Sequence, residues 1–273
     1  MTRDSSDTRS STEAADGPTV ASATEEPTEP TSDPVLEVTN VEHAYGSVEV
    51  LDDVSLSIPV GAMTALIGPN GSGKTTLLRI VARLLRPSWG TRRYNGPAVP
   101  REIGYLPQHP SFRPGFSVAE TLEFYGALVG EAPAVTAERL ETVGLEAAAG
   151  RPADALSGGM TRLLGIAQAT VGDPPLVVLD EPASGLDPGM RAHVFEVMTE
   201  LAATGTAVVV SSHDLELVER HADTIALLEQ GELIATGSPE TVLEAYDADS
   251  LYDAFETATA GESGRVAVRG ESR

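Results

Sequence analysis

Nine consecutive residues have the types and spacing that hold a phosphate group. The segment Gly68-Pro69-Asn70-Gly71-Ser72-Gly73-Lys74-Thr75-Thr76 has the spacing G-x-x-x-x-G-K-T of a phosphate-binding loop. Its glycines let the backbone approach phosphate oxygens closely, and its N–H groups, with a helix N-terminus, would surround one anion. Lys74 is the only lysine of the chain, and it would place a compact charge on the β- and γ-phosphates.

Two acidic residues follow an apolar run further along the chain. Leu176-Val177-Val178-Leu179 precedes Asp180 and Glu181. At the end of a buried strand beside the phosphate loop, Asp180 would hold Mg²⁺, directly or through water, together with Thr75. Glu181 would then activate a water molecule as general base. A strand that ends in a solvated acidic turn has the same pattern, but the presence of the phosphate loop favours the chemical interpretation.

The elements around these residues indicate an α/β fold. An apolar run over 63–67 predicts a buried strand before the loop, and apolar residues at helical spacing follow it over 77–85. The runs 176–180 and 207–211 are typical of parallel strands covered on both faces. We also expect strands at 36–41, 48–58, 103–106, 224–228 and 233–235, and helices after Ser117 and at 137–143, 158–171, 194–201 and 239–246.

Composition excludes several classes of protein. The 273 residues include 41 acidic and 18 basic ones, a net charge of -23. This charge opposes nucleic-acid binding, and it favours a high-salt cell over an ordinary acidic mesophile, because salt screens self-repulsion. The absence of cysteine excludes disulfides. There is no run of about 18–20 apolar residues for a membrane span and no apolar signal segment, so we expect a cytoplasmic location.

Both ends of the chain are poor in large apolar residues. Residues 1–33 contain eight acidic residues and two arginines, and such a composition cannot bury enough surface to order itself. We therefore expect a disordered acidic tail over 1–33, a folded domain over 34–257 and a flexible tail over 258–273.

A second glycine-containing motif completes a pattern that resembles the ATP-binding cassette (ABC) ATPase family, over roughly Val35 to Tyr246. It is Leu156-Ser157-Gly158-Gly159-Met160. Ser157 is placed to cap a helix whose N-terminus the glycines expose, which makes an anion site. The resemblance implies that Ser157, Gly158 and Gly159 grip the γ-phosphate of ATP bound to an opposing subunit. Met160 stands where the family usually has glutamine.

The resemblance assigns roles to four further residues. Tyr45 would stack on adenine, although a packing tyrosine would look the same in sequence. Gln108 would sense Mg²⁺ and water and form a link to the membrane partner. Asp187, in Ser184-Gly185-Leu186-Asp187-Pro188, would cross a dimer interface, and His213 would contact the γ-phosphate. Ala183 replaces a more usual threonine or serine.

The family implies an α/β P-loop NTPase of ABC type. It has a mostly parallel sheet core, an antiparallel β subdomain and a helical subdomain, here at about 112–170. Each motif occurs once, so the resemblance implies a dimer that encloses two ATP molecules with Mg²⁺. Transmembrane permease subunits would be separate chains, with this protein at the cytoplasmic face of the cell membrane. Phe112, Phe116 and Tyr125 would either dock the permease or pack in the helical core.

The family also contains members outside transport. An exporter-type (ABC-2) system fits the spacing of the motifs, and a soluble ABC ATPase of cofactor assembly is the alternative. A non-hydrolysing clamp is disfavoured by the presence of Lys74, Asp180, Glu181 and His213. The transported substrate and its direction stay open.

Overall fold

The computed structural model describes residues 33–259. The two tails expected from composition lie almost entirely outside this range. The expected boundary at residue 257 falls inside the last described helix, α8 (Leu251–Thr259).

A six-stranded sheet forms the centre of the molecule. Its order is β5-β6-β7-β3-β8-β9, and all neighbours are parallel except β8 and β9. Every residue of β3, β6 and β7 is buried, as expected for parallel strands covered on both faces. The strands are β3 (Met63–Ile67), β5 (Ile103–Leu106), β6 (Leu176–Asp180), β7 (Ala207–Ser211), β8 (Thr224–Glu229) and β9 (Glu232–Gly237).

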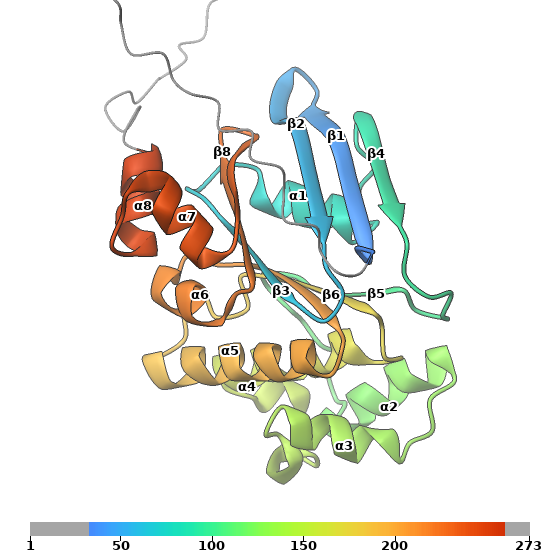
Figure 1. Ribbon diagram of the computed structural model, residues 1–273. Coiled ribbons are helices and arrows are strands. Elements are labelled where there is room, and N and C mark those ends of the chain that lie inside the picture. Colours follow the sequence, from blue (N-terminus) through green and yellow to red (C-terminus); the bar gives the residue numbers. More distant parts are fainter. Residues whose placement is uncertain (1–32, 260–273) are drawn as a thin grey trace, which may run out of the picture.

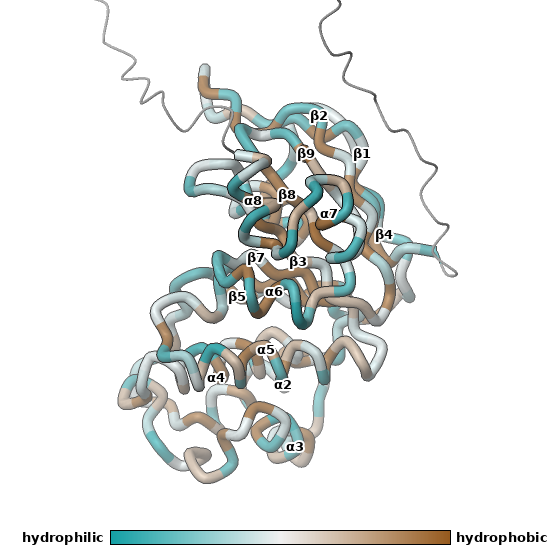
Figure 2. Tube along the Cα trace, turned by 60° about the vertical axis from the view of Figure 1, so that its left-hand side comes forward, coloured by the Kyte–Doolittle hydropathy of each residue, from teal (hydrophilic) through white to brown (hydrophobic). Residues whose placement is uncertain are grey.

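Helices cover both faces of this sheet (Figure 1). On one face, α1 (Lys74–Val81) packs with Leu176 and Val178 of β6. On the other, α4 (Gly158–Thr170), α5 (Pro188–Ala203) and α6 (Leu215–His221) pack with Val177 and Leu179. Figure 2 shows hydrophobic residues concentrated along the central strands. Alternate residues of β6 therefore face α1 on one side of the sheet and α4 and α5 on the other.

A second, antiparallel sheet lies above α1 (Figure 1). It has the order β2-β1-β4, formed by β1 (Leu36–Tyr45), β2 (Val48–Ile58) and β4 (Trp89–Tyr94). This sheet and the parallel core confirm the expected fold class. Strand β4 was not expected from the sequence.

Helices α2 (Val118–Val129) and α3 (Val135–Thr142) form a helical region with α4. Ser117 and Glu120 make a reciprocal capping box that fixes the start of α2. Helix α7 (Pro239–Tyr246) and α8 pack together at the other end of the molecule. Within residues 33–259, no helix has the length and apolar character needed to cross a membrane.

Candidate active site

The phosphate-binding motif forms the turn between β3 and α1. Gly68 directly follows β3, and a Cβ at this position would lie 2.0 Å from the carbonyl oxygen of Leu228. Gly73 has a φ of 106°, and its Cβ would lie 2.7 Å from the carbonyl oxygen of Val50 in β2. Both positions therefore require glycine. Asn70 and Gly71 are exposed at the tip of the loop.

The ammonium group of Lys74 lies inside this loop. Lys74 is 6% exposed, and its Nζ donates to the carbonyl oxygens of Gly68 at 2.7 Å and Pro69 at 2.9 Å. Burial lowers the pKa of Lys74, and the carboxylates of Glu181 and Asp180 oppose the decrease. An ammonium group has three donors, so one N–H remains for a further acceptor.

A hydroxyl group in the same loop also lacks a partner. Ser72 is buried, and its Oγ has no hydrogen bond within the described residues. An unpaired buried hydroxyl costs about 1–3 kcal/mol. Ser72, Lys74 and the backbone at the start of α1 thus present donors in one loop, and this donor set fits a phosphate group.

Two oxygens suited to a magnesium ion meet beside the loop. Thr75 Oγ1 donates to Asp180 Oδ1 at 3.2 Å, and Ser211 Oγ donates to the same oxygen at 2.8 Å. Neighbouring octahedral ligands of Mg²⁺, each at about 2.0–2.1 Å, would lie about 2.9 Å apart. The described residues contain no group of three or more His, Asp or Glu that could hold a metal. Thr75 and Asp180 therefore fit a Mg²⁺ whose other ligands are phosphate and water.

The carboxylate of Glu181 is held between two side chains. Gln108 Nε2 donates to Glu181 Oε2 at 3.2 Å, and His213 Nε2 lies 2.5 Å from Glu181 Oε1. The backbone of Glu181 has a φ of 48°, and its N–H donates to Ser211 Oγ at 2.9 Å. Such a conformation in a non-glycine residue costs about 1–3 kcal/mol and is concentrated at functional sites. The structure thus brings together Gln108, Glu181 and His213, which lie in distant segments of the sequence.

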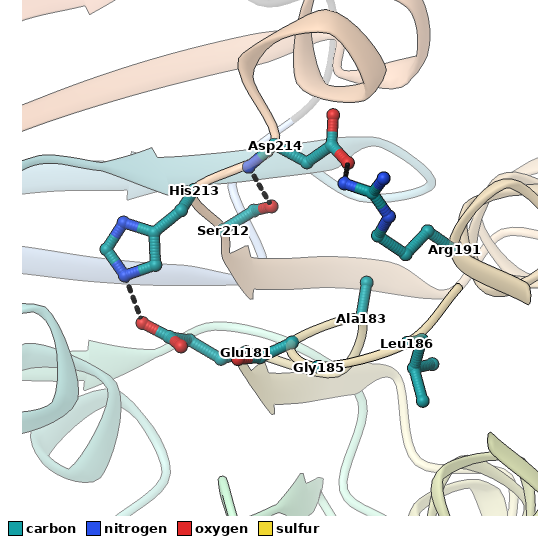
Figure 3. Close-up of a pocket in the computed structure, with 9 residues that line it drawn as sticks. Glu181, Ala183, Gly185, Leu186, Arg191, Ser212, His213 and Asp214 are labelled. Atoms are coloured by element: carbon teal, nitrogen blue, oxygen red, sulfur yellow. Dashed lines mark hydrogen bonds and ion pairs between the residues drawn. The ribbon is translucent and has the colours of Figure 1, made fainter. Parts of the chain in front are cut away.

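A pocket of about 220 Å³ opens beside Glu181 (Figure 3). Figure 3 shows Glu181 and His213 pointing toward one another across one side of it. Pockets that enclose a small molecule have about 300–1,000 Å³, so this pocket alone does not enclose a nucleotide. It is lined by Glu181, Ala183, Ser184, Gly185, Leu186, Arg191, Ser212, His213 and Asp214.

Tyr45 is the last residue of β1 and is 48% exposed. His43 contacts its ring edge-to-face, with centroids 4.7 Å apart. The neighbouring phenol groups of Tyr105 and Tyr45 raise the pKa of Arg79 in α1. The ring therefore lies next to the helix that follows the phosphate loop, with enough free surface to stack on a base.

Ser157–Gly159 and Asp187 form a second group, away from the phosphate loop. Ser157 caps α4 by accepting from the N–H of Met160 at 3.4 Å, and Asp187 caps α5 by accepting from Met190 at 3.1 Å. A Cβ on Gly159 would lie 2.7 Å from Cγ of Met190. The N-termini of α4 and α5 are therefore neighbours. Because α4 and α5 lie across the sheet from α1 (Figure 1), the structure does not bring this group to the phosphate loop of the same chain.

Both departures from the family pattern place an apolar side chain against the core. Met160 is half-buried and packs against the apolar core, and Ala183 is buried in that core. A methionine and a small apolar side chain suit these two positions.

Sequence reasoning did not find Ser211 and Arg162. Ser211 Oγ donates to Asp180 and accepts from the backbone N–H of Glu181. The sequence indicated this residue only as a polar one at the end of an apolar strand. Arg162 of α4 donates to the carbonyl oxygen of Gln108. Burial lowers the pKa of Arg162, against the effect of the carboxylates of Glu181 and Asp180.

Comparisons with known proteins agree with this geometry. The family model described as "ABC transporter" matches residues 51–184, a range that contains the phosphate loop, Ser157 and Glu181. The Nod factor export ATP-binding protein I of Ralstonia nicotianae is 34% identical over 261 residues, which cover 88% of this chain and 81% of that protein.

Solved structures of two related proteins have the same fold. The ATP-binding subunit of an ABC transporter is 29% identical, with a TM-score of 0.74, over 82% of this chain and 99% of that one. The ATP-binding cassette MJ0796, in a dimeric post-hydrolysis state bound to ADP and Pi, is 25% identical with a TM-score of 0.67. That match covers 75% of this chain and 98% of the cassette.

Proposed function

The chain belongs to the family of ABC transporter ATP-binding subunits, and we propose that Glu181 is the general base of its ATPase site, which a second copy of the chain completes. The protein is an ATP-hydrolysing subunit of this family. One observation carries the assignment of the base: both carboxylate oxygens of Glu181 are held, by Gln108 at 3.2 Å and His213 at 2.5 Å.

Each residue of the site has a defined part in this proposal. Lys74, Ser72 and the loop backbone bind the phosphates of ATP through the donors described above. Thr75 and Asp180 would hold a Mg²⁺ ion, which would neutralise charge on the phosphate oxygens. Glu181 accepts a proton from the attacking water, while Gln108 and His213 hold its carboxylate in place.

The second copy supplies the missing part of the site. One observation supports a homodimer: Ser157–Gly159 and Asp187 lie at the starts of α4 and α5, and these helices lie across the sheet from α1 (Figure 1). The related cassette MJ0796 is dimeric. The helix N-terminus at Ser157 would then bind the γ-phosphate held by the other chain.

A membrane partner would dock on the exposed apolar face of α2. Phe124 and Leu128 are 41% and 69% exposed, whereas Phe112 and Tyr125 pack partly buried against the core. We infer that transmembrane permease subunits cover this face and hold the protein at the cytoplasmic face of the membrane. The relative named for Nod factor export favours an exporter. A pull-down that recovers only soluble partners would favour the alternative, a soluble ATPase of cofactor assembly.

The acidic composition supports a high-salt cell as the setting of this function. The net charge of -23 produces self-repulsion that destabilises a compact chain, and concentrated salt screens it.

The assignment of the base is tested by ATP hydrolysis in the Glu181→Gln variant. We expect kcat to fall by about 10²–10⁴-fold, the usual contribution of a positioned general base. The matched control is Glu141→Gln, because Glu141 is exposed on α3, outside the site. Hydrolysis by Glu181→Gln at the parent rate would show that Glu181 is not the base.

A further inference from the structure

An ion pair joins α5 to the loop that carries His213. Arg191 lies in the first turn of α5, and its Nη1 donates to Asp214 Oδ2 at 2.7 Å. Asp214 directly follows His213 in the chain, and Figure 3 shows the guanidinium and the carboxylate facing one another. The roles proposed above use neither Arg191 nor Asp214.

Two further contacts hold the backbone next to His213. Asp214 Oδ1 accepts from the N–H of Leu217 at 3.3 Å and so caps α6. The N–H of Asp214 donates to Ser212 Oγ at 3.0 Å. Since Arg191 ties the remaining carboxylate oxygen of Asp214 to α5, the backbone that carries His213 is anchored at the next residue.

Arg191 differs from an ordinary surface arginine. Exposed ion pairs contribute little to stability, but Nε of Arg191 is buried and has no hydrogen-bond partner in the described part of the chain. Its side chain lines the pocket beside Glu181 and also a second pocket of about 510 Å³ that reaches Gly68 and Phe255. Arg191 thus lines both the pocket beside Glu181 and the pocket that reaches Gly68.

Arg191 is also close to the proposed dimer surface. It lies four residues after Asp187, and its backbone N–H donates to the carbonyl oxygen of Asp187 at 3.0 Å. A partner that displaces Asp187 would therefore move Arg191, and through Asp214 it would move the loop of His213.

We propose that Arg191 is a positioning residue for ATP hydrolysis. Through Asp214 it holds His213 against Glu181, and it connects this contact to the partner-facing Asp187. The inference rests on the proposed function of the site, because it acts only through His213 and the general base.

The first test compares three variants in steady-state ATP hydrolysis. For Arg191→Met we expect kcat to fall about tenfold while KM changes less than about twofold, because geometry is lost and nucleotide contacts are kept. Arg191→Lys should recover part of the rate, since it retains the charge. Arg220→Met is the control, because Arg220 makes an exposed ion pair with Glu216 at 2.7 Å on α6. An unchanged kcat in Arg191→Met would overturn the proposal.

The second test separates positioning from a general loss of structure. If Arg191 acts through His213, then Arg191→Met lowers the rate of the parent but not the residual rate of His213→Ala. A fall by the same factor in both backgrounds would contradict the proposal.

NMR gives a third readout that does not depend on turnover. The ring signals of His213, identified by their loss in His213→Ala, should shift in Arg191→Met, whereas those of the exposed His109 should not. Unmoved His213 signals would contradict the proposal. Failure of the proposed function would show differently, as hydrolysis by Glu181→Gln at the parent rate.

Discussion

Gln108 and Glu181 lie 73 residues apart in sequence and are joined by a hydrogen bond of 3.2 Å from Nε2 to Oε2. Gln108 follows β5, and Glu181 follows the neighbouring strand β6. The backbone carbonyl oxygen of Gln108 accepts a hydrogen bond from Arg162 of α4. The helix that Ser157 caps is therefore connected to the general base through Gln108.

Gln108→Ala should reduce turnover more than binding. The amide that orients Glu181 is removed, so we expect kcat to fall about 10- to 100-fold, with nearly unchanged affinity for ATP. Steady-state kinetics and equilibrium nucleotide binding measure the two effects. His109→Ala, a change at the next and exposed position, is the control. Equal kcat values in the two variants would contradict the role of Gln108.

Lys74 should titrate below its usual range in the free protein. Burial lowers its pKa from 10.5, so the ammonium loses its proton at a lower pH than an exposed lysine does. Nucleotide phosphates should raise the pKa again, and affinity for ATP should therefore fall as pH rises through the pKa of the free protein. Because the chain has a single lysine, ¹³C-lysine labelling gives one ε-carbon signal to follow. A pKa of 10.5 or above without nucleotide would contradict this account.

Asp180→Asn should lower the affinity of the ATPase site for Mg²⁺. The amide retains an oxygen to accept from Thr75 and Ser211, but the negative charge that attracts the cation is lost. We expect the Mg²⁺ concentration for half-maximal hydrolysis to rise by about tenfold or more, and chelation by EDTA to stop hydrolysis in the parent. An unchanged Mg²⁺ dependence would place the metal elsewhere.

The central strands could be predicted from sequence because each is an unbroken apolar run. The bounds of β3, β6 and β7 match the expected ones. Strand β4 could not be found in this way, because it lies at a sheet edge with the sequence WGTRRY and alternates between exposed and half-buried residues. Helix α5 begins at Pro188, six residues before the expected Val194, although Asp187 followed by proline is a strong helix-start signal.

The place of a candidate site residue in the fold could be predicted where that residue ends or follows a strand or caps a helix. Asp180 ends β6, Glu181 follows it, His213 lies two residues after β7, and Ser157 caps α4. Arg162 and Arg191 lie inside helices, so their contacts depend on how α4 and α5 pack against the sheet. Sequence spacing alone does not contain that information.

Salt should stabilise the fold. As ionic strength rises from about 0.1 M to about 1 M, the Debye length falls from about 10 Å to about 3 Å. Repulsion among the excess acidic groups then weakens, so we expect Tm to rise by several degrees. Thermal unfolding in potassium chloride and in tetramethylammonium chloride should give equal increases, because screening does not depend on the cation. A Tm that is constant or falls with salt would contradict the high-salt setting.

The mass of the Glu181→Gln variant in solution tests the composite site most directly. With ATP and Mg²⁺, the variant should bind nucleotide without hydrolysing it, and the N-terminus of α4 should remain on the γ-phosphate of the other chain. Light scattering should then give twice the 28.5 kDa of one chain, and the dimer should be lost with ADP. A monomer at saturating ATP would contradict a site built from two chains.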